Sequence, residues 1–252
     1  MTRAGIVTGA SSGIGRATAR RLADDGFAVL AVGRDAEALA AVCGEINGSG
    51  GRAEPHVADV TAERAPDAIV GRAIELFGGL DALVNAAGVI ASGGVAETTD
   101  AAWDGMFDVN VRAPFRLLRA AVPHLTARKG AVVNVSSVAG LRAFPGLASY
   151  AVSKAAVDQL TRCAALDLAG VGVRVNAVNP GVVVTNLHRR GGMDEDRYAA
   201  FLDRSSTTHP LGRPGTPEEI ADLIAYLISP RAGWITGETI AIDGGRHLTC
   251  LR

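Results

Sequence analysis

The chain has 252 residues, of which 48% are hydrophobic, 20% are charged and 31 are glycine. This length and composition predict a globular protein with a substantial core and argue against a disordered chain. The 25 basic residues against 26 acidic ones give a net charge of −1, whereas a protein that binds nucleic acid through phosphates needs a basic excess. No run approaches about 18 apolar residues and no signal-peptide segment precedes the first glycine-rich turn, so we expect no membrane association.

Cys43, Cys163 and Cys250 are far apart and show no CxxC spacing. An odd number of isolated cysteines argues against a disulfide framework or a zinc site, and indicates a cytoplasmic protein. The five histidines show no ligand spacing either, so we expect no bound metal. Trp103 and Trp234 fall among apolar neighbours and are expected in the core.

Short apolar runs alternate along the chain with longer amphipathic stretches. The runs that predict strands cover residues 4–8, 28–32, 53–59, 80–85, 131–136, 173–178 and 239–242. The stretches that predict helices cover residues 14–24, 36–46, 65–77, 103–125, 150–168 and 217–228. Nearly continuous apolar runs are typical of strands buried on both faces of a parallel sheet. The alternation therefore predicts a single α/β domain over residues 1–252, a Rossmann-type doubly wound parallel sheet of about seven strands with helices on both faces.

Residues 186–213 interrupt this alternation. They contain two adjacent glycines, the acidic run 194–196 and no strand pattern. An insertion of this size at the carboxyl end of a strand predicts a substrate loop that closes as a lid, and a surface excursion without function is the alternative. We interpret the acidic run as a solvated face. We also interpret His188 as a solvated loop residue, with contact to substrate as the alternative.

A glycine-rich turn joins the first strand to the first helix and reads TGASSGIG over residues 8–15. Glycines at such a turn let the backbone approach a pyrophosphate, and the helix N-terminus offers it unpaired N–H groups and a positive dipole end. The residues expected to contact a dinucleotide here are Gly9, Ser11, Ser12, Gly13, Ile14 and Gly15.

This turn resembles the TGxxxGxG turn of the short-chain dehydrogenase/reductase family, and motifs along essentially the whole chain resemble that family in the same order. The cofactor contacts that the resemblance implies are Asp59 and Val60 after the third strand, Asn85, Ala86 and Gly88 in a segment where Ala86 replaces the second Asn of an NNAG motif, and Pro180, Gly181, Val183 and Thr185 beside the nicotinamide. The catalytic residues that it implies are Asn110, Ser137, Tyr150 and Lys154, and the C-terminal signature is Asp243-Gly244-Gly245.

Tyr150 and Lys154 stand four residues apart, so on a helix they project from one face. A free phenol with a pKa near 10 is a poor acid or base at neutral pH, and a nearby ammonium is expected to lower that pKa. Only Lys129 and Lys154 among the 25 basic residues are lysines, which indicates a chemical requirement for an ammonium beside Tyr150. The resemblance implies that Tyr150 and Lys154 also hold the nicotinamide ribose.

Ser137 follows an apolar run, so it is expected at the carboxyl end of a central strand, where open α/β sheets bind ligands. Its hydroxyl would stabilise the substrate oxygen as negative charge develops. Ser136 is the alternative, and the 13-residue spacing to Tyr150 that the family shows selects Ser137. The resemblance implies that Asn110 supports a proton relay to Lys154, whereas by itself Asn110 would be interpreted as a residue that caps or kinks its helix.

The choice of dinucleotide depends on the residues that follow the second strand. Where an NAD-specific site has a carboxylate for the ribose hydroxyls, this chain has Gly33, followed by Arg34 and Asp35. The Arg34 guanidinium suits a 2′-phosphate, so we predict NADP as the cofactor, with NAD possible if Asp35 turns inward. Ser12 stands where many NADP-dependent relatives have a second basic residue.

These residues predict an oxidoreductase that interconverts a small-molecule ketone and a secondary alcohol. One alternative is a 3-oxoacyl-[acyl-carrier-protein] reductase, which the basic pair Arg128–Lys129 favours and Val171 disfavours, because such enzymes tend to have a basic residue at that turn. A catalytically silent dinucleotide sensor is another alternative, against which the intact catalytic set argues, and an epimerase or dehydratase is a third. The resemblance also implies a homotetramer assembled through the helices near 103–125 and 150–168.

Overall fold

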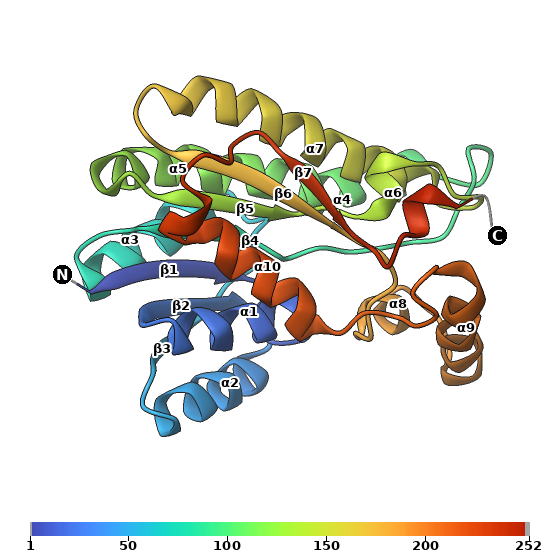
Figure 1. Cartoon of the computed structure of the whole chain (residues 1–252), viewed down its shortest axis with the longest axis horizontal. Coiled ribbons are helices and arrows are strands. Elements are labelled where there is room, and N and C mark those ends of the chain that lie inside the picture. Colours follow the sequence, from blue (N-terminus) through green and yellow to red (C-terminus); the bar gives the residue numbers. More distant parts are fainter. Residues whose placement is uncertain (1, 250–252) are drawn as a thin grey trace.

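The computed structural model describes residues 2–249, and its seven strands form one parallel sheet in the order β3-β2-β1-β4-β5-β6-β7 (Figure 1). The strands are β1 (Arg3–Thr8), β2 (Phe27–Gly33), β3 (Arg52–Val57), β4 (Ala82–Asn85), β5 (Ala131–Val135), β6 (Arg174–Pro180) and β7 (Thr239–Ile242). All neighbouring strands pair in parallel. The predicted α/β fold and all seven predicted strands are confirmed.

Helices cover both faces of this sheet (Figure 1). The main helices are α1 (Gly13–Asp24), α2 (Ala36–Gly48), α3 (Ala65–Phe77), α4 (Asp100–Phe107), α5 (Ala113–Arg128), α7 (Ala148–Ala169), α9 (Glu195–Thr208) and α10 (Pro217–Ile228). The shorter ones are the π-helix η1 (Asp108–Arg112), α6 (Val138–Leu141), α8 (Leu187–Arg190) and the 3₁₀ helices η2 (Pro230–Ala232) and η3 (Arg246–Leu248).

Two hydrophobic clusters hold these layers together. One joins α1, α2 and α10 to one face of the sheet, and the other joins α3, α5 and α7 to the opposite face. All seven residues of β2 are buried, because this strand lies inside the sheet, whereas β3 at the edge alternates in exposure. Chain order reverses between β1 and β4, and in such sheets the crevice for a ligand lies at the carboxyl ends of the strands beside that point.

The helix predicted over 103–125 is divided. A π-helical turn, η1, separates α4 from α5, and Pro114 occupies the first turn of α5. Proline fits a first turn because it has no N–H to donate there. Single π turns inside helices are frequent at functional sites, and this one contains Asn110.

The substrate loop predicted over 186–213 is mostly helical. It contains α8 and the 14-residue α9, which lie beyond the carboxyl ends of the strands (Figure 1). The acidic run 194–196 is the start of α9, since Asp194 is its N-cap and accepts a hydrogen bond from the Arg197 N–H. Acidic residues there are favoured by the helix dipole. All three residues are exposed, which confirms the interpretation as a solvated face.

Both tryptophans lie at the surface, so the prediction that they belong to the core is wrong. Trp103 is 37% exposed and stacks on Phe107, one turn further along α4, while Trp234 is fully exposed. Apolar sequence neighbours do not bury a side chain that points away from the sheet.

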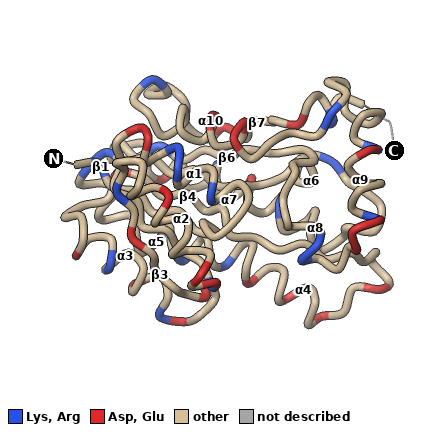
Figure 2. Tube along the Cα trace, turned by 90° about the horizontal axis from the view of Figure 1, so that it is seen from below, with Lys and Arg blue, Asp and Glu red and all other residues tan. Residues whose placement is uncertain are grey.

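Acidic and basic residues are interspersed along the outer helices and turns (Figure 2). Within residues 2–249, no group of His, Cys, Asp and Glu side chains is arranged to hold a metal ion. In the same range, every helix is too short or too polar to cross a membrane. Cys43 and Cys163 are free thiols, and Cys250 lies outside the described residues.

Candidate active site

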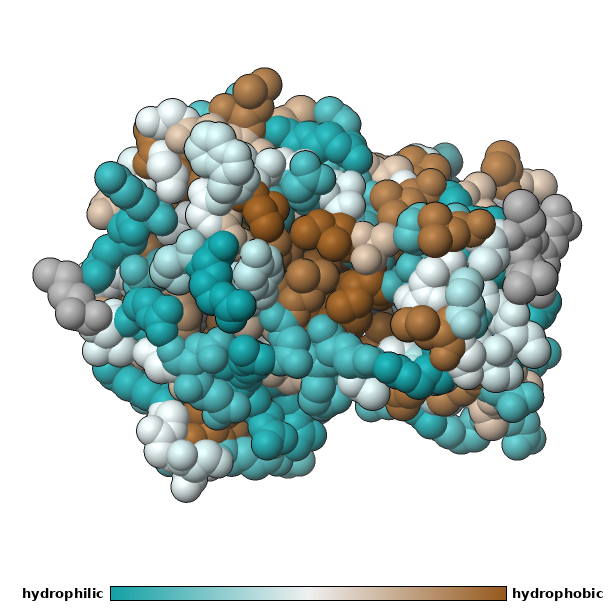
Figure 3. Space-filling view, in the orientation of Figure 1, coloured by the Kyte–Doolittle hydropathy of each residue, from teal (hydrophilic) through white to brown (hydrophobic). Residues whose placement is uncertain are grey.

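A cavity of about 860 Å³ opens at the carboxyl ends of the central strands. Apolar side chains gather in the middle of the face drawn in Figure 3, between the main body and the α8–α9 segment. Of the residues predicted to bind cofactor or to catalyse, those lining the cavity are Gly9, Ser12, Gly13, Ile14, Gly15, Ala86, Gly88, Ser137, Tyr150, Lys154, Pro180, Gly181, Val183 and Thr185. Ser11, Arg34, Asp59, Val60, Asn85 and Asn110 lie outside this lining.

The turn between β1 and α1 forms a cradle for a diphosphate. Gly9 and Gly13 have positive φ angles of 68° and 54°, which favour glycine. A Cβ on Gly9 would lie 2.9 Å from the Ala86 carbonyl oxygen, and one on Gly13 would lie 3.1 Å from Cγ2 of Thr185. The N-cap Ser12 makes no side-chain cap and the first turn of α1 has no acidic residue. Its N–H groups are therefore available to an anion, so the residues present fit a dinucleotide.

Side chains that follow β2 and β3 are those predicted to contact the adenosine part of a dinucleotide. Asp35 is the N-cap of α2 and accepts a hydrogen bond of 3.0 Å from the Ala38 N–H. Its carboxylate is thus engaged by the helix. Hydrogen bonds from the Thr61 N–H and hydroxyl lower the pKa of Asp59, and the charge of Arg34 lowers it further. Arg34 is exposed and is free to meet a ligand.

The segment after β4 is held by buried polar contacts. The Thr8 hydroxyl accepts hydrogen bonds of 3.1 Å from the N–H groups of Ala86 and Ala87. The Asn85 amide donates to the Asn134 side chain at 2.8 Å. These bonds fix the backbone of residues 85–88 without the second Asn of the family motif, because they use the main-chain N–H groups of Ala86 and Ala87.

Tyr150 and Ser137 face the cavity together. Tyr150 is buried on α7, and Ser137 is the N-cap of α6 directly after β5. Burial raises the pKa of the phenol, and a hydrogen bond with the Ser137 side chain only partly opposes that rise. The expectation that Lys154 lowers this pKa is therefore wrong for the protein alone, because loss of water around the phenol outweighs the other effects.

Ser136 is engaged elsewhere. Its hydroxyl donates to the Lys154 carbonyl oxygen at 3.1 Å and also hydrogen-bonds Asp158. Of the two adjacent serines, Ser137 is the one whose hydroxyl meets the phenol of Tyr150.

Lys154 lies one helical turn after Tyr150, with Nζ 5.8 Å from the centre of the tyrosine ring. Its ammonium donates to the Val135 carbonyl oxygen at 2.8 Å. Burial lowers the pKa of Lys154 from 10.5 to about 8, although the charge of Asp158 opposes the shift. The ammonium is thus held at the end of β5 in a poorly solvated position.

Asn110 is buried in η1 and joins two segments. Its amide bonds both the N–H and the carbonyl oxygen of Val89 at 3.0 Å, and it donates to the Ser153 hydroxyl at 3.0 Å. A Cβ on Gly88 would lie 3.4 Å from the Asn110 side-chain oxygen and 3.6 Å from Lys154 Nζ. Asn110 and Lys154 therefore border the same space beside Gly88, without a direct hydrogen bond.

The segment after β6 is tied to the α8–α9 region. The Tyr198 hydroxyl of α9 donates to the Thr185 carbonyl oxygen at 2.8 Å and accepts from its N–H at 3.1 Å. The His209 ring accepts a hydrogen bond of 3.2 Å from the Val182 N–H. These contacts hold Val183 and Thr185 on the cavity wall, where Thr185 lies against Gly13 of the glycine turn.

A buried carboxylate that the sequence analysis missed connects α7 to the segments that follow β5 and β6. Asn179, at the end of β6, donates to both oxygens of Asp158 at 3.1 and 2.9 Å and to the Ser137 carbonyl oxygen at 3.0 Å. Burial raises the pKa of Asp158. An acidic residue four positions after Lys154 was the available signal, because i, i+4 spacing puts both on one side of α7.

The segment after β5, helix α9 and the chain after β7 add cavity residues that were also missed. They are Arg142, Phe144, Phe201, Arg204, Ser205, Thr208 and Arg246. His188 is half-buried, lines the cavity and lies 4.4 Å from the Phe201 ring, and burial lowers its pKa. The interpretation of His188 as a solvated residue is therefore wrong.

Comparison with known proteins places this site in a family. A family model described as enoyl-(acyl carrier protein) reductase matches residues 9–247. The chain is 37% identical to 3-oxoacyl-[acyl-carrier-protein] reductase of Thermotoga maritima, covering 95% of this chain and 96% of that one. It is 40% identical to 3beta-hydroxysteroid dehydrogenase of Mediterraneibacter gnavus, covering 95% and 93%.

A solved structure agrees with these relatives. The crystal structure of a short-chain dehydrogenase/reductase of unknown function from Caenorhabditis elegans, with cofactor, superposes with a TM-score of 0.92 at 38% identity. The match covers 98% of this chain and 96% of that one. The chain therefore belongs to the short-chain dehydrogenase/reductase family, whose members are oxidoreductases that use a nicotinamide dinucleotide.

Proposed function

We propose that this protein is an NADP(H)-preferring oxidoreductase that interconverts a ketone and a secondary alcohol. The observation that carries the proposal is the meeting of a buried phenol, a serine hydroxyl and an ammonium in one cavity beside a diphosphate cradle. Glycines 9, 13 and 15 with the N-terminus of α1 would hold the diphosphate, and Val183 and Thr185 would hold the nicotinamide carboxamide.

Each catalytic side chain has a role in this reaction. A bound nicotinamide dinucleotide supplies the hydride that the carbonyl carbon gains in reduction. Tyr150 gives its phenolic proton to the substrate oxygen, so the carbonyl becomes a hydroxyl group. Ser137 donates a hydrogen bond to the same oxygen and stabilises the developing negative charge. Lys154 compensates the charge left on Tyr150 and binds the ribose hydroxyls, and Asn110 borders the route by which the proton is replaced.

The chemistry is tested by replacing Tyr150 with Phe, which keeps the ring and removes the proton donor. We expect turnover of ketones to fall by roughly 10²–10⁴, the usual contribution of general acid–base catalysis, while affinity for the cofactor stays within a few-fold. The measurement is steady-state kinetics over a panel of ketones and alcohols, followed by nicotinamide absorbance, with cofactor titrations of both proteins. Near-normal turnover by Tyr150→Phe contradicts the proposed role.

Cofactor preference is proposed from Arg34. Asp35 caps α2 through its side chain, so it does not present a free carboxylate, whereas Arg34 is exposed beside Asp59. A hydrogen bond to a charged group contributes about 1.5–3 kcal/mol, or roughly one to two orders of magnitude. We expect kcat/KM to favour NADPH by that factor and Arg34→Ala to erase most of the preference. Arg231→Ala is the control, because Arg231 is exposed in η2 and lies outside the cavity lining. A preference for NADH in the unmodified protein contradicts the proposal.

A carrier-bound 3-oxoacyl chain is a second candidate substrate, favoured by the similarity to the Thermotoga maritima reductase. The basic pair Arg128–Lys129 lies at the C-terminal end of α5, where an acidic carrier would meet it. Comparing a 3-oxobutanoyl carrier protein with the N-acetylcysteamine thioester of the same acyl group tests this idea. A preference for the carrier that Lys129→Glu removes supports it, and equal kcat/KM values contradict it.

The proposed assembly is a cytoplasmic homotetramer formed through α4, α5 and α7. Exposed apolar side chains on these helices support it, namely Trp103, Phe115, Val152 and Leu166. The free thiols of Cys43 and Cys163 are compatible with a reducing compartment.

A further inference from the structure

The cavity wall is unequally charged. Among the described residues that line it, the charged side chains are Arg142, Lys154, Arg190, Arg204 and Arg246, and none is an Asp or Glu. The whole chain has nearly equal numbers of acidic and basic residues, so this distribution is a property of the cavity. A concave wall with one sign of charge concentrates ligands of the opposite sign.

The diphosphate cradle does not account for three of these arginines. The cradle follows β1, whereas Arg142 follows β5 and Arg246 follows β7. In the sheet order β1-β4-β5-β6-β7, four strand spacings separate β1 from β7, a distance of about 19 Å. Arg204 belongs to α9, which lies on the same side as the carboxyl end of β7 (Figure 1). These three arginines are therefore at the substrate end of the cavity.

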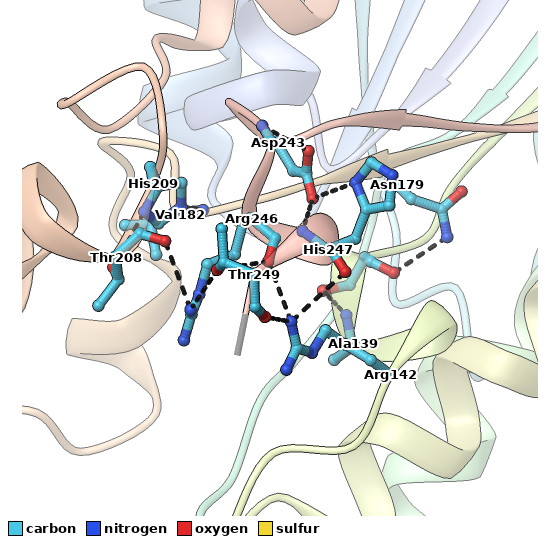
Figure 4. A network of polar contacts seen from close by, with 12 residues as sticks. Ala139, Arg142, Asn179, Val182, Thr208, His209, Asp243, Arg246, His247 and Thr249 are labelled. Carbon is cyan, nitrogen blue, oxygen red and sulfur yellow. Dashed lines mark hydrogen bonds and ion pairs between the residues drawn. The ribbon is translucent and has the colours of Figure 1, made fainter. Parts of the chain in front are cut away.

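Arg142 and Arg246 lie beside the same aromatic ring. Their guanidinium carbons are 5.5 and 5.3 Å from the centre of the Phe144 ring, which lines the cavity. Figure 4 shows the two side chains next to each other, with Arg142 directed at η3. Nη1 of Arg142 donates to the carbonyl oxygens of Arg246 at 3.1 Å, His247 and Thr249. Carbonyl oxygens orient a guanidinium without cancelling its charge, and Nη2 and Nε take no part in these three bonds.

Arg204, on α9, is the third arginine at the substrate end of the cavity. The cavity-facing residues of α9 are Phe201, Arg204, Ser205 and Thr208, the i, i+3, i+4, i+7 spacing of one helix face. Burial lowers the pKa of Arg246, the charges of Arg142 and Arg204 lower it further, and the charge of Asp243 opposes the shift. The guanidinium groups of Arg142 and Arg204 therefore each lie close enough to that of Arg246 to repel it.

Other arginines of the same region are paired with carboxylates. Arg189 bonds Glu195 at 2.6 Å, Arg197 contacts Asp194 at 3.5 Å and Arg213 bonds Glu219 at 2.6 Å. Within residues 2–249, the side chains of Arg190 and Arg204, which both line the cavity, make no hydrogen bond or ion pair. The arginines of this region outside the cavity lining are thus paired with carboxylates, whereas Arg204 is available to a ligand.

We propose that the substrate carries an anionic group, such as a carboxylate, phosphate or sulfonate, bound by Arg142 and Arg204 while its carbonyl or hydroxyl group lies at Ser137 and Tyr150. Arg246 supports the site in two ways. It adds positive charge, and its carbonyl oxygen accepts a hydrogen bond from Arg142. This inference rests on the proposed interconversion of ketone and alcohol and specifies its substrate class. The fork of a guanidinium suits such anions because it donates two parallel hydrogen bonds.

The test compares oxo acids with neutral partners of the same shape. The probes are 4-oxopentanoate, 5-oxohexanoate and 6-oxoheptanoate with their primary amides, so the distance from carbonyl to anion varies. Two quantities are measured: kcat/KM for reduction, and affinity for the NADP⁺-bound protein by calorimetry. The variants are Arg204→Gln and Arg142→Gln, with Arg142→Lys to restore charge. Arg197→Gln is the matched control, since Arg197 lies on the same helix and outside the cavity lining.

We expect at least one acid to exceed its amide roughly tenfold or more in both quantities, because a charge-assisted hydrogen bond is worth about that factor or more. The ratio of acid to amide falls toward one in Arg204→Gln and Arg142→Gln. It recovers partly in Arg142→Lys and stays unchanged in Arg197→Gln. If the protein reduces acids and amides with equal kcat/KM and binds them with equal affinity, the anionic substrate is overturned and the proposed function is left intact. Arginine-dependent binding of an acid without reduction of any ketone supports the anion site and overturns the proposed function. If the protein neither binds the acids nor reduces any ketone, the anion site and the proposed function are both overturned.

Discussion

Burial works against ionisation at Tyr150 and Lys154, the two side chains proposed to be central to catalysis. It raises the pKa of Tyr150 and lowers that of Lys154 to about 8. Tyr150 is therefore a protonated phenol at neutral pH in the protein alone, which suits a residue that gives a proton to a carbonyl oxygen. Lys154 retains its proton at neutral pH, and its hydrogen bond to Val135 holds the charge beside the phenol. Burial of these groups lowers the free energy of unfolding, because water solvates both side chains in the unfolded chain.

The titration of Lys154 predicts how stability depends on pH. Its pKa is about 8 in the folded protein against 10.5 for the ordinary side chain. Between these values the unfolded chain binds more protons, so this residue makes stability rise with pH. We expect the free energy of unfolding of the native protein to rise by about 2 kcal/mol relative to Lys154→Met between about pH 7 and pH 9.5. Urea unfolding of both proteins across that range measures the difference.

Other groups that titrate in this range are common to both proteins, so they cancel in the comparison. Lys129→Met is the control, because Lys129 lies at the end of α5 outside the cavity, and it should show no such divergence. Parallel pH profiles for Lys154→Met and the native protein contradict the lowered pKa of Lys154.

At the scale of elements, the sequence predicted those whose side chains face the apolar core. The strands and α1, α2, α3, α7 and α10 were recognised because buried faces require apolar residues at regular spacing. Helix α9 was missed because the face that it turns to the cavity carries Arg204, Ser205 and Thr208, so the apolar period is broken. The π turn around Asn110 was missed because it depends on tertiary contacts with Val89 and Ser153.

The α8–α9 segment is expected to respond to ligands. Arg190 is exposed at the end of α8, whereas Arg189 is bound to Glu195 and packs 3.9 Å from the centre of the Tyr198 ring. Trypsin should therefore cleave first after Arg190. Because the cavity is lined by residues of both helices, bound NADP⁺ with a substrate alcohol should slow this cleavage several-fold. Timed digestion followed by mass spectrometry identifies the site and the rate.

Tyr198→Phe provides the matched variant for that experiment. It keeps the buried ring and removes the hydroxyl that bonds the main chain of Thr185. We expect faster cleavage of this variant without ligands, since the anchor of α9 is weakened. Cleavage at equal rates with and without ligands argues against a segment that closes over the cavity.

On the scale of the whole molecule, the sheet order assembles the site from segments that are distant in sequence. Arg142 and Thr249 are 107 residues apart and hydrogen-bonded, because β5 and β7 end at the same edge of the sheet. Motif spacing was enough to predict that Ser137, Tyr150 and Lys154 meet in one cavity, since they occur within a short stretch of chain. The arginine group could not be predicted in this way, because its members belong to three segments that only the folded sheet brings together.

The exposed apolar side chains of α5 and α7 lead to a prediction about assembly. Phe115 is 45% exposed and Leu166 is 80% exposed, on helices that cover the same face of the sheet. Large exposed apolar groups gathered on one face are typical of subunit interfaces. We expect the native protein to have about four times the 25.8 kDa mass of one chain, and Phe115→Glu with Leu166→Glu to convert it to smaller species. Size-exclusion chromatography with light scattering measures both masses.

Val57→Glu is the control, because Val57 is an exposed apolar residue on the edge strand β3, and it should keep the native mass. A native protein of 25.8 kDa, or a double variant with unchanged mass, contradicts assembly through this face.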